Sequence, residues 1–406
     1  MTGILDGIKV VELASWTFVP AAGAVLADWG ADVIKVEDTK AGDPGRALVV
    51  GGLRRDKARA DADFMLEIGN RGKRSIGLDL KSEKGHEYLA KLLADADVFL
   101  TNWLPAPLER ANLTFEQVKA INPNIIVARG SGQGSRGPDR NRGGFDSASF
   151  MARGGVAYAL SPDDAEYPLG QGPAFGDLPS GMTLAGGVIG ALYHREKTGE
   201  ATTVDVSLLA QAMWTMAPDI LASDFFGVDR IPVPPVGSSV NPVTHKYRTL
   251  DDRWIQLVFL QPDKFWANFC HRVGLSELAE DPRFVPSANL IANTNEAAAL
   301  LRDHFLTRDL EHWTKVLADE PGVWSALASP QEVLVDPQAS SNGYLIENKD
   351  DNGVDYRVVA PPVQYGNVTP EPSRAPEHGQ HTEEILLELG LSWGDIAEAK
   401  DSGSVL

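Results

Sequence analysis

The sequence predicts an α/β protein with a large domain built on a parallel sheet and a smaller α+β domain. Short β-rich runs alternate with helical runs from residue 8 to residue 216, which is the pattern of parallel strands joined by crossover helices. The chain has 406 residues, more than one hydrophobic core supports, so two domains are expected. A proline-rich segment at 231–237 interrupts the alternation, and it can form neither a helix nor an inner strand.

The alternation begins with a strand at 8–13, a helix at 21–29 and a strand at 31–37. Pro20 suits the first turn of this helix and Gly30 suits its end. The other elements expected before the proline-rich segment are strands at 75–80, 96–101, 124–129 and 204–207, and helices at 82–95, 115–121, 180–196 and from 207 to 216. Glycine, serine, arginine and proline dominate 130–144, which predicts a loop.

The second domain is placed at 225–335, where aromatic-rich helices are expected at 263–273 and 310–318. The first domain then covers residues 1–224. A third segment, 336–406, returns to a strand at 356–360 and a final helix at 382–389.

Composition excludes several classes of function. The formal net charge of -19 disfavours nucleic acids and anionic membranes as partners, because a polyanion needs a basic footprint. No apolar run is long enough to cross a bilayer, and the first residues lack a signal-peptide pattern. The single cysteine, Cys270, rules out an internal disulfide and any multi-cysteine metal site. We therefore expect a cytoplasmic or equivalently reducing location.

Two common active-site motifs are missing. No G-x-G-x-x-G follows the first strand, so a nicotinamide or flavin site is not expected. No G-x-S-x-G elbow of a serine hydrolase is present. His378 and His381 have a spacing that could hold a metal, although a turn explains it better, and no metal site is predicted.

Short motifs follow one another along nearly the whole chain. They are 5–13 (LDGIKVVEL), 30–37 (GADVIKVE), 70–81 (NRGKRSIGLDLK), 96–98 with Asn102-Trp103, 121–123 (INP), 137–138 (GP), 144–146 (GFD), 176–177 (GD) with 180–182 (SGM), 197–199 (KTG) with 204–207 (VDVS), 281–284 (DPRF), 336–338 (DPQ) and 381–383 (HTE). Each motif is weak alone. In this order, they resemble the family III coenzyme A transferases, the CaiB/BaiF or formyl-CoA transferase-like superfamily.

The resemblance implies a fold, an assembly and an activity. The fold is a Rossmann-like large domain completed by residues 336–406, with the small domain between. The assembly is a homodimer of interlocked rings. The activity moves coenzyme A (CoA) from an acyl-CoA donor to a carboxylic acid acceptor, so acyl-CoA is a substrate and no cofactor is bound permanently.

Asp177 matches the nucleophilic aspartate of the family's G-D-x-x-x-G pattern. From the local sequence alone, Asp177 is better explained as a turn or N-cap residue. The resemblance implies instead that its carboxylate attacks the thioester, forming an anhydride and then an aspartyl-CoA thioester, as in covalent catalysis generally.

The CoA contacts are implied by the same motifs. They fall at Thr17, Phe18, Leu78, Lys81, Asn102, Trp103, Leu104, Arg110, Ser131, Gly132, Gln133 and Gly134. Arg71, Lys73 and Arg74 form the densest basic cluster, which is equally explained as a solvated strand edge. Asp38 stands where the family often has a CoA-binding arginine, so that phosphate contact is either lost or supplied elsewhere, for example by Lys40 or Arg46.

Two alternatives stay open. Racemases of the superfamily, the α-methylacyl-CoA racemases, pair the aspartate with a histidine, but Phe145 occupies that position here and cannot carry a proton. Gln261 likewise stands where those racemases have a glutamate. The chain could also be a non-catalytic acyl-CoA binding paralogue, against which the presence of Asp177 argues.

The acyl group itself is only weakly indicated by the sequence. The loop 237–241 has fewer glycines than the active-site flap of formyl-CoA type enzymes, which disfavours an oxalate-sized acid. Trp16 and Phe18 lie beside the expected acyl site and indicate a larger or more apolar acid.

Overall fold

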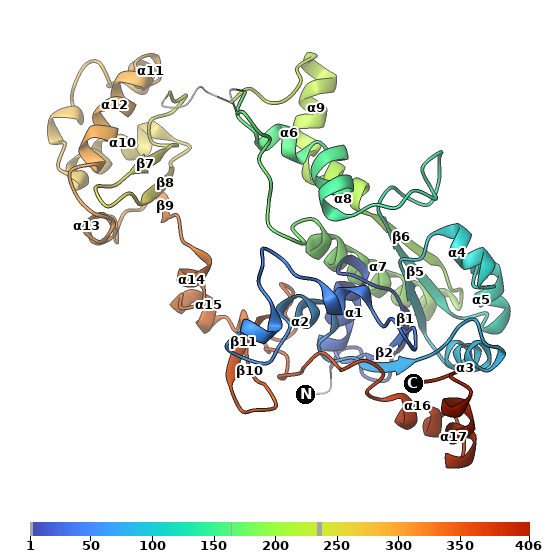
Figure 1. Cartoon of the computed structure of the whole chain (residues 1–406). Helices are drawn as coiled ribbons and strands as arrows, with labels where there is room; N and C mark the ends of the chain where they lie inside the picture. Colours follow the sequence, from blue (N-terminus) through green and yellow to red (C-terminus); the bar gives the residue numbers. More distant parts are fainter. Residues whose placement is uncertain (1–2, 164, 234–237) are drawn as a thin grey trace. The chain divides into compact units, whose positions relative to one another are not determined.

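The computed structural model describes residues 3–163, 165–233 and 238–406. The chain divides into two compact units, one formed by Met1–Arg230 with Gln338–Leu406 and the other by Ile231–Pro337. The boundaries expected from the sequence, at 224/225 and 335/336, fall close to these positions. Figure 1 traces both units along the chain.

A six-stranded sheet organises the large unit, in the order β3-β2-β1-β4-β5-β6. All five strand pairings are parallel, which confirms the predicted α/β class with a parallel sheet. This order, 3-2-1-4-5-6, is that of a doubly wound nucleotide-binding sheet. The strands are β1 (Lys9–Leu13), β2 (Asp32–Glu37), β3 (Arg74–Gly77), β4 (Val98–Thr101), β5 (Ile126–Ser131) and β6 (Thr203–Ser207).

Helices cover both faces of the sheet because successive strand residues point to opposite faces. On one face Val10 and Val98 pack with α1 (Phe18–Asp28), α7 (Asp177–Thr198) and α8 (Leu208–Thr215). On the other face Val11 and Phe99 pack with α3 (Glu83–Ala94) and α5 (Phe115–Ile121). The other helical segments are α2 (Phe64–Asn70), α4 (Pro105–Arg110), α6 (Val156–Leu160), α9 (Ala217–Phe226) and a π-helical segment, Asp146–Arg153.

The C-terminal segment belongs to the large unit. It forms a hairpin of β10 (Leu345–Lys349) and β11 (Asp355–Val359), preceded by α15 (Pro337–Ser341). Two helices, α16 (Thr382–Glu388) and α17 (Trp393–Asp401), then complete the core on the α3 side of the sheet. The last residues reach the end of β3, where the amide of Leu406 donates to the carbonyl of Gly77.

The prediction that the helix at 382–389 is the last one was wrong. The helix α17 follows it, and its start is fixed by a capping box in which Ser392 and Asp395 bond reciprocally. Serine followed three residues later by an acidic residue is a start signal that can be seen in the sequence.

The small unit has its own core and its own antiparallel sheet, in the order β7-β8-β9. The predicted helices at 263–273 and 310–318 are present as α10 and α13, whereas the three strands and the other three helices were not predicted. Its elements are β7 (Lys246–Arg248), β8 (Trp254–Val258), β9 (Val323–Ala326), α10 (Pro262–Val273), α11 (Ser287–Ala292), α12 (Thr294–Phe305), α13 (Leu310–Val316) and α14 (Pro330–Val333).

Within the described ranges, no helix combines the length and the apolar character that crossing a bilayer requires. The proline-rich segment 231–237 and the loop 237–241 fall partly outside the described residues. Of that loop, Ser239 is buried and its hydroxyl donates to the carbonyl of Asn241 at 2.7 Å.

Candidate active site

The candidate site lies at the carboxyl edge of the six-stranded sheet. Because all the strands are parallel, the loops that follow them share this edge, and ligands of such sheets bind where the strand order reverses. That point is between β1 and β4. Asn102, directly after β4, accepts from the amide of Ser15 at 3.2 Å and donates to its carbonyl at 2.7 Å. This side chain ties the two loops of the crevice together.

Asp177 is the first residue of α7, and two glycines set its position. A Cβ atom at Gly176 would overlap Phe150 and lie 2.6 Å from Oδ1 of Asp146. A Cβ atom at Gly181 would lie 2.8 Å from the carbonyl oxygen of Phe18, in the first turn of α1. The G-D-x-x-x-G pattern is therefore a packing requirement, since both glycines allow neighbouring elements to approach the start of α7.

The carboxyl group of Asp177 has an unusually high pKa for an aspartate. Burial, with a further contribution from the charge of Asp146, raises the pKa of Asp177 to about 7. Asp146 is itself buried, and its Oδ1 accepts from the amide of Gly176 at 3.0 Å. Burial raises the pKa of Asp146 as well, against the backbone hydrogen bonds that lower it. The charge of Asp146 and the burial of both groups thus favour the protonated form of Asp177.

The loop after β5 is fastened to the segment that carries Asp146. A Cβ atom at Gly132 would lie 2.6 Å from the Cα of Gly144. Gln133 donates to the hydroxyl of Ser149 at 2.8 Å and accepts from Arg153 at 2.9 Å. The predicted CoA contacts at 131–134 are thus held next to the acid pair, and Gly134 takes a left-handed conformation with φ of 101°.

The remaining predicted contacts divide into exposed and buried groups. Lys81 and Arg110 are exposed at the same edge, after β3 and at the end of α4. Thr17 and Phe18 are buried at the start of α1, and Leu78 is fully buried in the core. The structure therefore does not bring the side chains of Phe18 and Leu78 to the surface of the crevice. Trp103 and Leu104 are half-buried, and Ser131 caps its own loop by accepting from Gly134 at 3.0 Å.

The basic cluster 71–74 is not a phosphate site. Arg71 pairs with Asp28, and Arg74 pairs with Asp32 at 2.6 Å. Lys73 is buried and bonds to Glu12 at 2.6 Å. Arg46 is also paired, because its guanidinium donates two hydrogen bonds, of 2.8 and 2.6 Å, to the carboxylate of Glu37. The dense basic cluster in the sequence therefore corresponds to ion pairs within the protein.

At the position of the family's arginine, Asp38 has a local role. Its Oδ1 accepts from the amides of Lys40 and Ala41, which lowers its pKa. His378 contacts the carbonyl oxygen of Asp38 at 2.8 Å, while His381 accepts from the amide of Ser75 at 3.1 Å. Both histidines thus bond the C-terminal segment to residues of the sheet and the loop after β2. The described residues contain no cluster of metal-ligating side chains.

Two further features were not anticipated from the sequence. Trp16 and Phe145 form an edge-to-face pair with ring centroids 5.4 Å apart. Beneath them lies a buried ion network, which we define as Glu12, Lys35, Asp43 and Lys73. No local signal marks the network, since its members come from two strands, β1 and β2, and from two loops.

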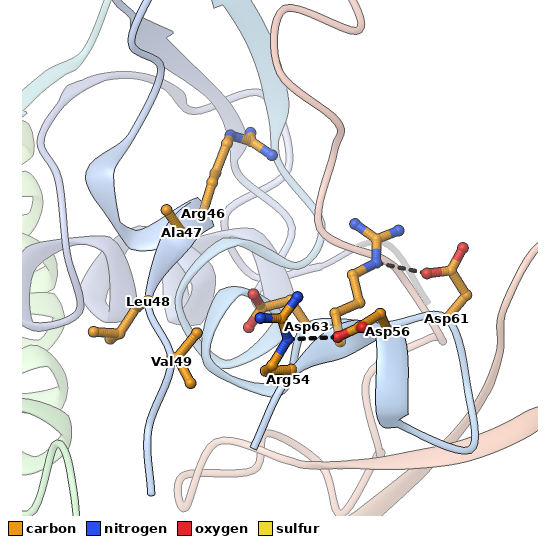
Figure 2. Close-up of a pocket in the computed structure, with 9 residues that line it drawn as sticks. Arg46, Ala47, Leu48, Val49, Arg54, Asp56, Asp61 and Asp63 are labelled. Carbon is orange, nitrogen blue, oxygen red and sulfur yellow. Dashed lines mark hydrogen bonds and ion pairs between the residues drawn. The ribbon is translucent and has the colours of Figure 1, made fainter. Parts of the chain in front are cut away.

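A shallow pocket of about 450 Å³ opens in the segment 46–63. In Figure 2, Leu48 and Val49 line one side of it and Arg54, Asp56 and Asp63 the other. The charges are largely satisfied locally, because Arg54 pairs with Asp56 at 2.8 Å and Arg55 with Asp61 at 2.6 Å.

Comparison with known proteins gives one consistent result. The model of CoA-transferase family III matches residues 5–382. The (R)-2-hydroxy-4-methylpentanoate CoA-transferase of Clostridioides difficile is 32% identical over 98% of this chain and 98% of its own length. The cinnamoyl-CoA:phenyllactate CoA-transferase of Clostridium sporogenes is 33% identical, with 100% and 98% covered. A crystal structure of a CAIB/BAIF family protein from Brucella suis matches with a TM-score of 0.80 and 28% identity, over 96% of this chain and 100% of that chain.

The chain therefore belongs to CoA-transferase family III, the CaiB/BaiF family, and is a CoA-transferase that works on acyl-CoA substrates. The resemblance inferred from the short motifs is confirmed over the full length.

Proposed function

We propose that this protein moves CoA from an acyl-CoA donor to a carboxylic acid with Asp177 as the nucleophile. The observation that supports this most is a carboxylate at the sheet's carboxyl edge whose pKa is raised to about 7. Within the described ranges no cation pairs with it. A group of this kind is ionised in a useful fraction at neutral pH and is more basic, hence more nucleophilic, than an ordinary aspartate.

The chemistry runs through two anhydrides. The Asp177 carboxylate attacks the thioester carbonyl, the C–S bond breaks, and CoA leaves as a thiolate. The thiolate then attacks the aspartyl carbonyl of the mixed anhydride, which releases the donor acid and leaves CoA on Asp177 as a thioester. The acceptor carboxylate attacks that thioester, and the returning thiolate attacks the new acyl carbonyl. This yields the new acyl-CoA and restores Asp177.

The CoA moiety would lie along the crevice with its phosphates toward Lys81 and Arg110. Both side chains are exposed, and neither has an ion pair among the described residues. Arg110→Ala should weaken CoA binding, and the effect should shrink as salt rises. Lys197→Ala is a matched control, because Lys197 is exposed at the far end of α7. Equal losses for both variants in calorimetry would show that CoA does not lie at Arg110.

The decisive activity test is a transfer screen with a panel of acyl-CoA donors and free acids, run in heavy water. A transferase needs no base at the α-carbon, and Phe145 offers none at the position where the racemases have a histidine. We expect acid-dependent CoA transfer without exchange of the α-proton. Rapid deuterium incorporation without transfer would favour a racemase, and binding of CoA without either reaction would indicate a non-catalytic protein.

The interlocked homodimer is part of the same proposal. The helix α9 has no buried residue and exposes Leu221, Phe225 and Phe226, while Trp214 at the end of α8 is 80% exposed. Apolar surface on this scale marks an interface, and a second copy of the chain would cover it. Light scattering should give twice the monomer mass, and a monomer at micromolar concentration would contradict this part of the proposal.

A further inference from the structure

Trp16 and Phe145 are an exposed aromatic pair with no role in the core. Trp16 is 39% exposed and Phe145 is 59% exposed, and their rings meet edge to face. Exposed large apolar groups that are held in contact with one another mark a surface that binds something.

Trp16 is held in place at an energetic cost. Its φ is 71°, a left-handed conformation that costs a non-glycine residue about 1–2 kcal/mol. The restraint is a hydrogen bond of 3.0 Å from the Trp16 amide to Oδ1 of Asp43. Asp43 is itself anchored by the Lys35 ammonium at 2.8 Å inside the buried ion network. Glycine would adopt this backbone without strain, so the strain is the cost of placing an indole at this position.

The pair stands beside the acid pair of the candidate active site. Phe145 directly precedes Asp146, whose side chain bonds to the amide before Asp177. Trp16 directly precedes Thr17 and the first turn of α1, which packs at Gly181 against the first turns of α7. The two rings therefore approach the start of α7 from two different elements.

Asp43 also connects Trp16 to a second segment, which carries apolar side chains. Asp43 accepts from the amide of Gly45 at 2.8 Å as well as from Trp16. From Gly45 the chain runs directly into Ala47, Leu48 and Val49, the apolar side of the pocket in Figure 2.

We propose that Trp16 and Phe145 form the wall that binds the apolar side chain of the acyl group, and that they select branched or aromatic carboxylic acids over small or dicarboxylic ones. The inference rests on the proposed function. Both the donor acyl group and the acceptor acid occupy the wall in turn, because each is joined to Asp177 as an anhydride. Two rings without charges can desolvate an isobutyl or phenyl group, but they leave a second carboxylate unpaired.

The test compares donors across variants. Trp16→Gly removes the ring and relieves the left-handed strain, so the variant should fold as well as the wild type. We expect its kcat/KM to fall about 10-fold or more with 4-methylpentanoyl-CoA or cinnamoyl-CoA, and by much less with acetyl-CoA. Trp16→Phe should recover most of the loss. Phe145→Ala should lower kcat/KM selectively for the same two donors.

The matched control is Trp393→Ala, since Trp393 is 65% exposed on α17 and should leave all donors unchanged. Equal losses of kcat/KM for large and small donors in Trp16→Gly, or no loss at all, would contradict the proposed wall. Neither result would contradict the proposed transferase activity. If the wild type transfers CoA from no donor, the proposed function fails, and this inference fails with it.

Discussion

Two groups of buried charges lie close together in the large unit, and they are built in opposite ways. In the buried ion network, Glu12 and Asp43 face Lys35 and Lys73, so that two carboxylates are matched by two ammonium groups. In the acid pair, the charge of Asp146 acts on Asp177, and no cation is paired with either among the described residues. Burial is common to both groups, and only the compensation of charge differs.

The difference shows which group maintains the fold and which is suited to chemistry. The matched charges form ion pairs that link β1, β2 and the loop after α2 in the interior. In the acid pair, burial and then the charge of Asp146 raise the pKa of Asp177 to about 7. The account therefore predicts that variants in the network change stability, whereas variants in the acid pair change reactivity.

The largest expected effect is on activity, from Asp177→Asn. Loss of the nucleophile should lower kcat by on the order of 10³-fold or more. The folded protein binds a proton at Asp177 between about pH 4 and about pH 7 that the unfolded chain releases, so ionisation of this group lowers stability as pH rises through that range. At pH 8 the variant should thus unfold at a higher denaturant concentration than the wild type. Asp95→Asn, at an exposed carboxylate, should change neither quantity.

The next effect is on stability, from Glu12→Gln. The Glu12 carboxylate is fully buried and bonds to Lys35 at 3.2 Å and to Lys73 at 2.6 Å. Its neutralisation leaves an unmatched buried ammonium, which should cost about 3–5 kcal/mol in urea unfolding. Glu398→Gln removes an exposed partner of Lys84 and should cost less than about 1 kcal/mol. Similar costs for the two variants would mean that the network carries no special share of stability.

The smallest effect is a shift of the pH profile, from Asp146→Asn. The asparagine can still accept from the amide of Gly176, but it no longer repels the charge of Asp177. The pKa of Asp177 should fall, and the acid limb of kcat/KM should move below its wild-type position near pH 7. Circular dichroism should be unchanged. An acid limb that stays in place would show that Asp146 does not tune Asp177.

Much of the fold could be predicted from the sequence because its signals are local. Alternating strands and helices predicted the parallel sheet, and Ser82 at the start of α3 is an N-cap that can be seen in the sequence. The small antiparallel sheet was missed because β7 has only three residues, too few to show a period. The helix α17 was missed although Ser392 and Asp395 form a capping-box pattern that indicates a helix start.

The site was predictable only as a set of loops. The family resemblance implied that Asn102 and 131–134 contact CoA, and the structure places them after the parallel strands β4 and β5 at one edge of the sheet. The buried state of Phe18 and Leu78, and the pairing of Arg71 and Lys73 with acids, depend on contacts between residues far apart in the chain. No pattern in the sequence reveals whether a basic side chain points into the protein or out of it.

The most direct test of the account is to look for CoA on Asp177. The protein should be mixed with an acyl-CoA donor in the absence of an acceptor acid, digested, and analysed by mass spectrometry. We expect the peptide that contains Asp177 to carry CoA as a thioester, to lose it on addition of hydroxylamine or an acceptor acid, and to be unlabelled in Asp177→Asn. CoA bound to a different residue, or normal turnover by Asp177→Asn, would contradict the assignment of Asp177 as the nucleophile.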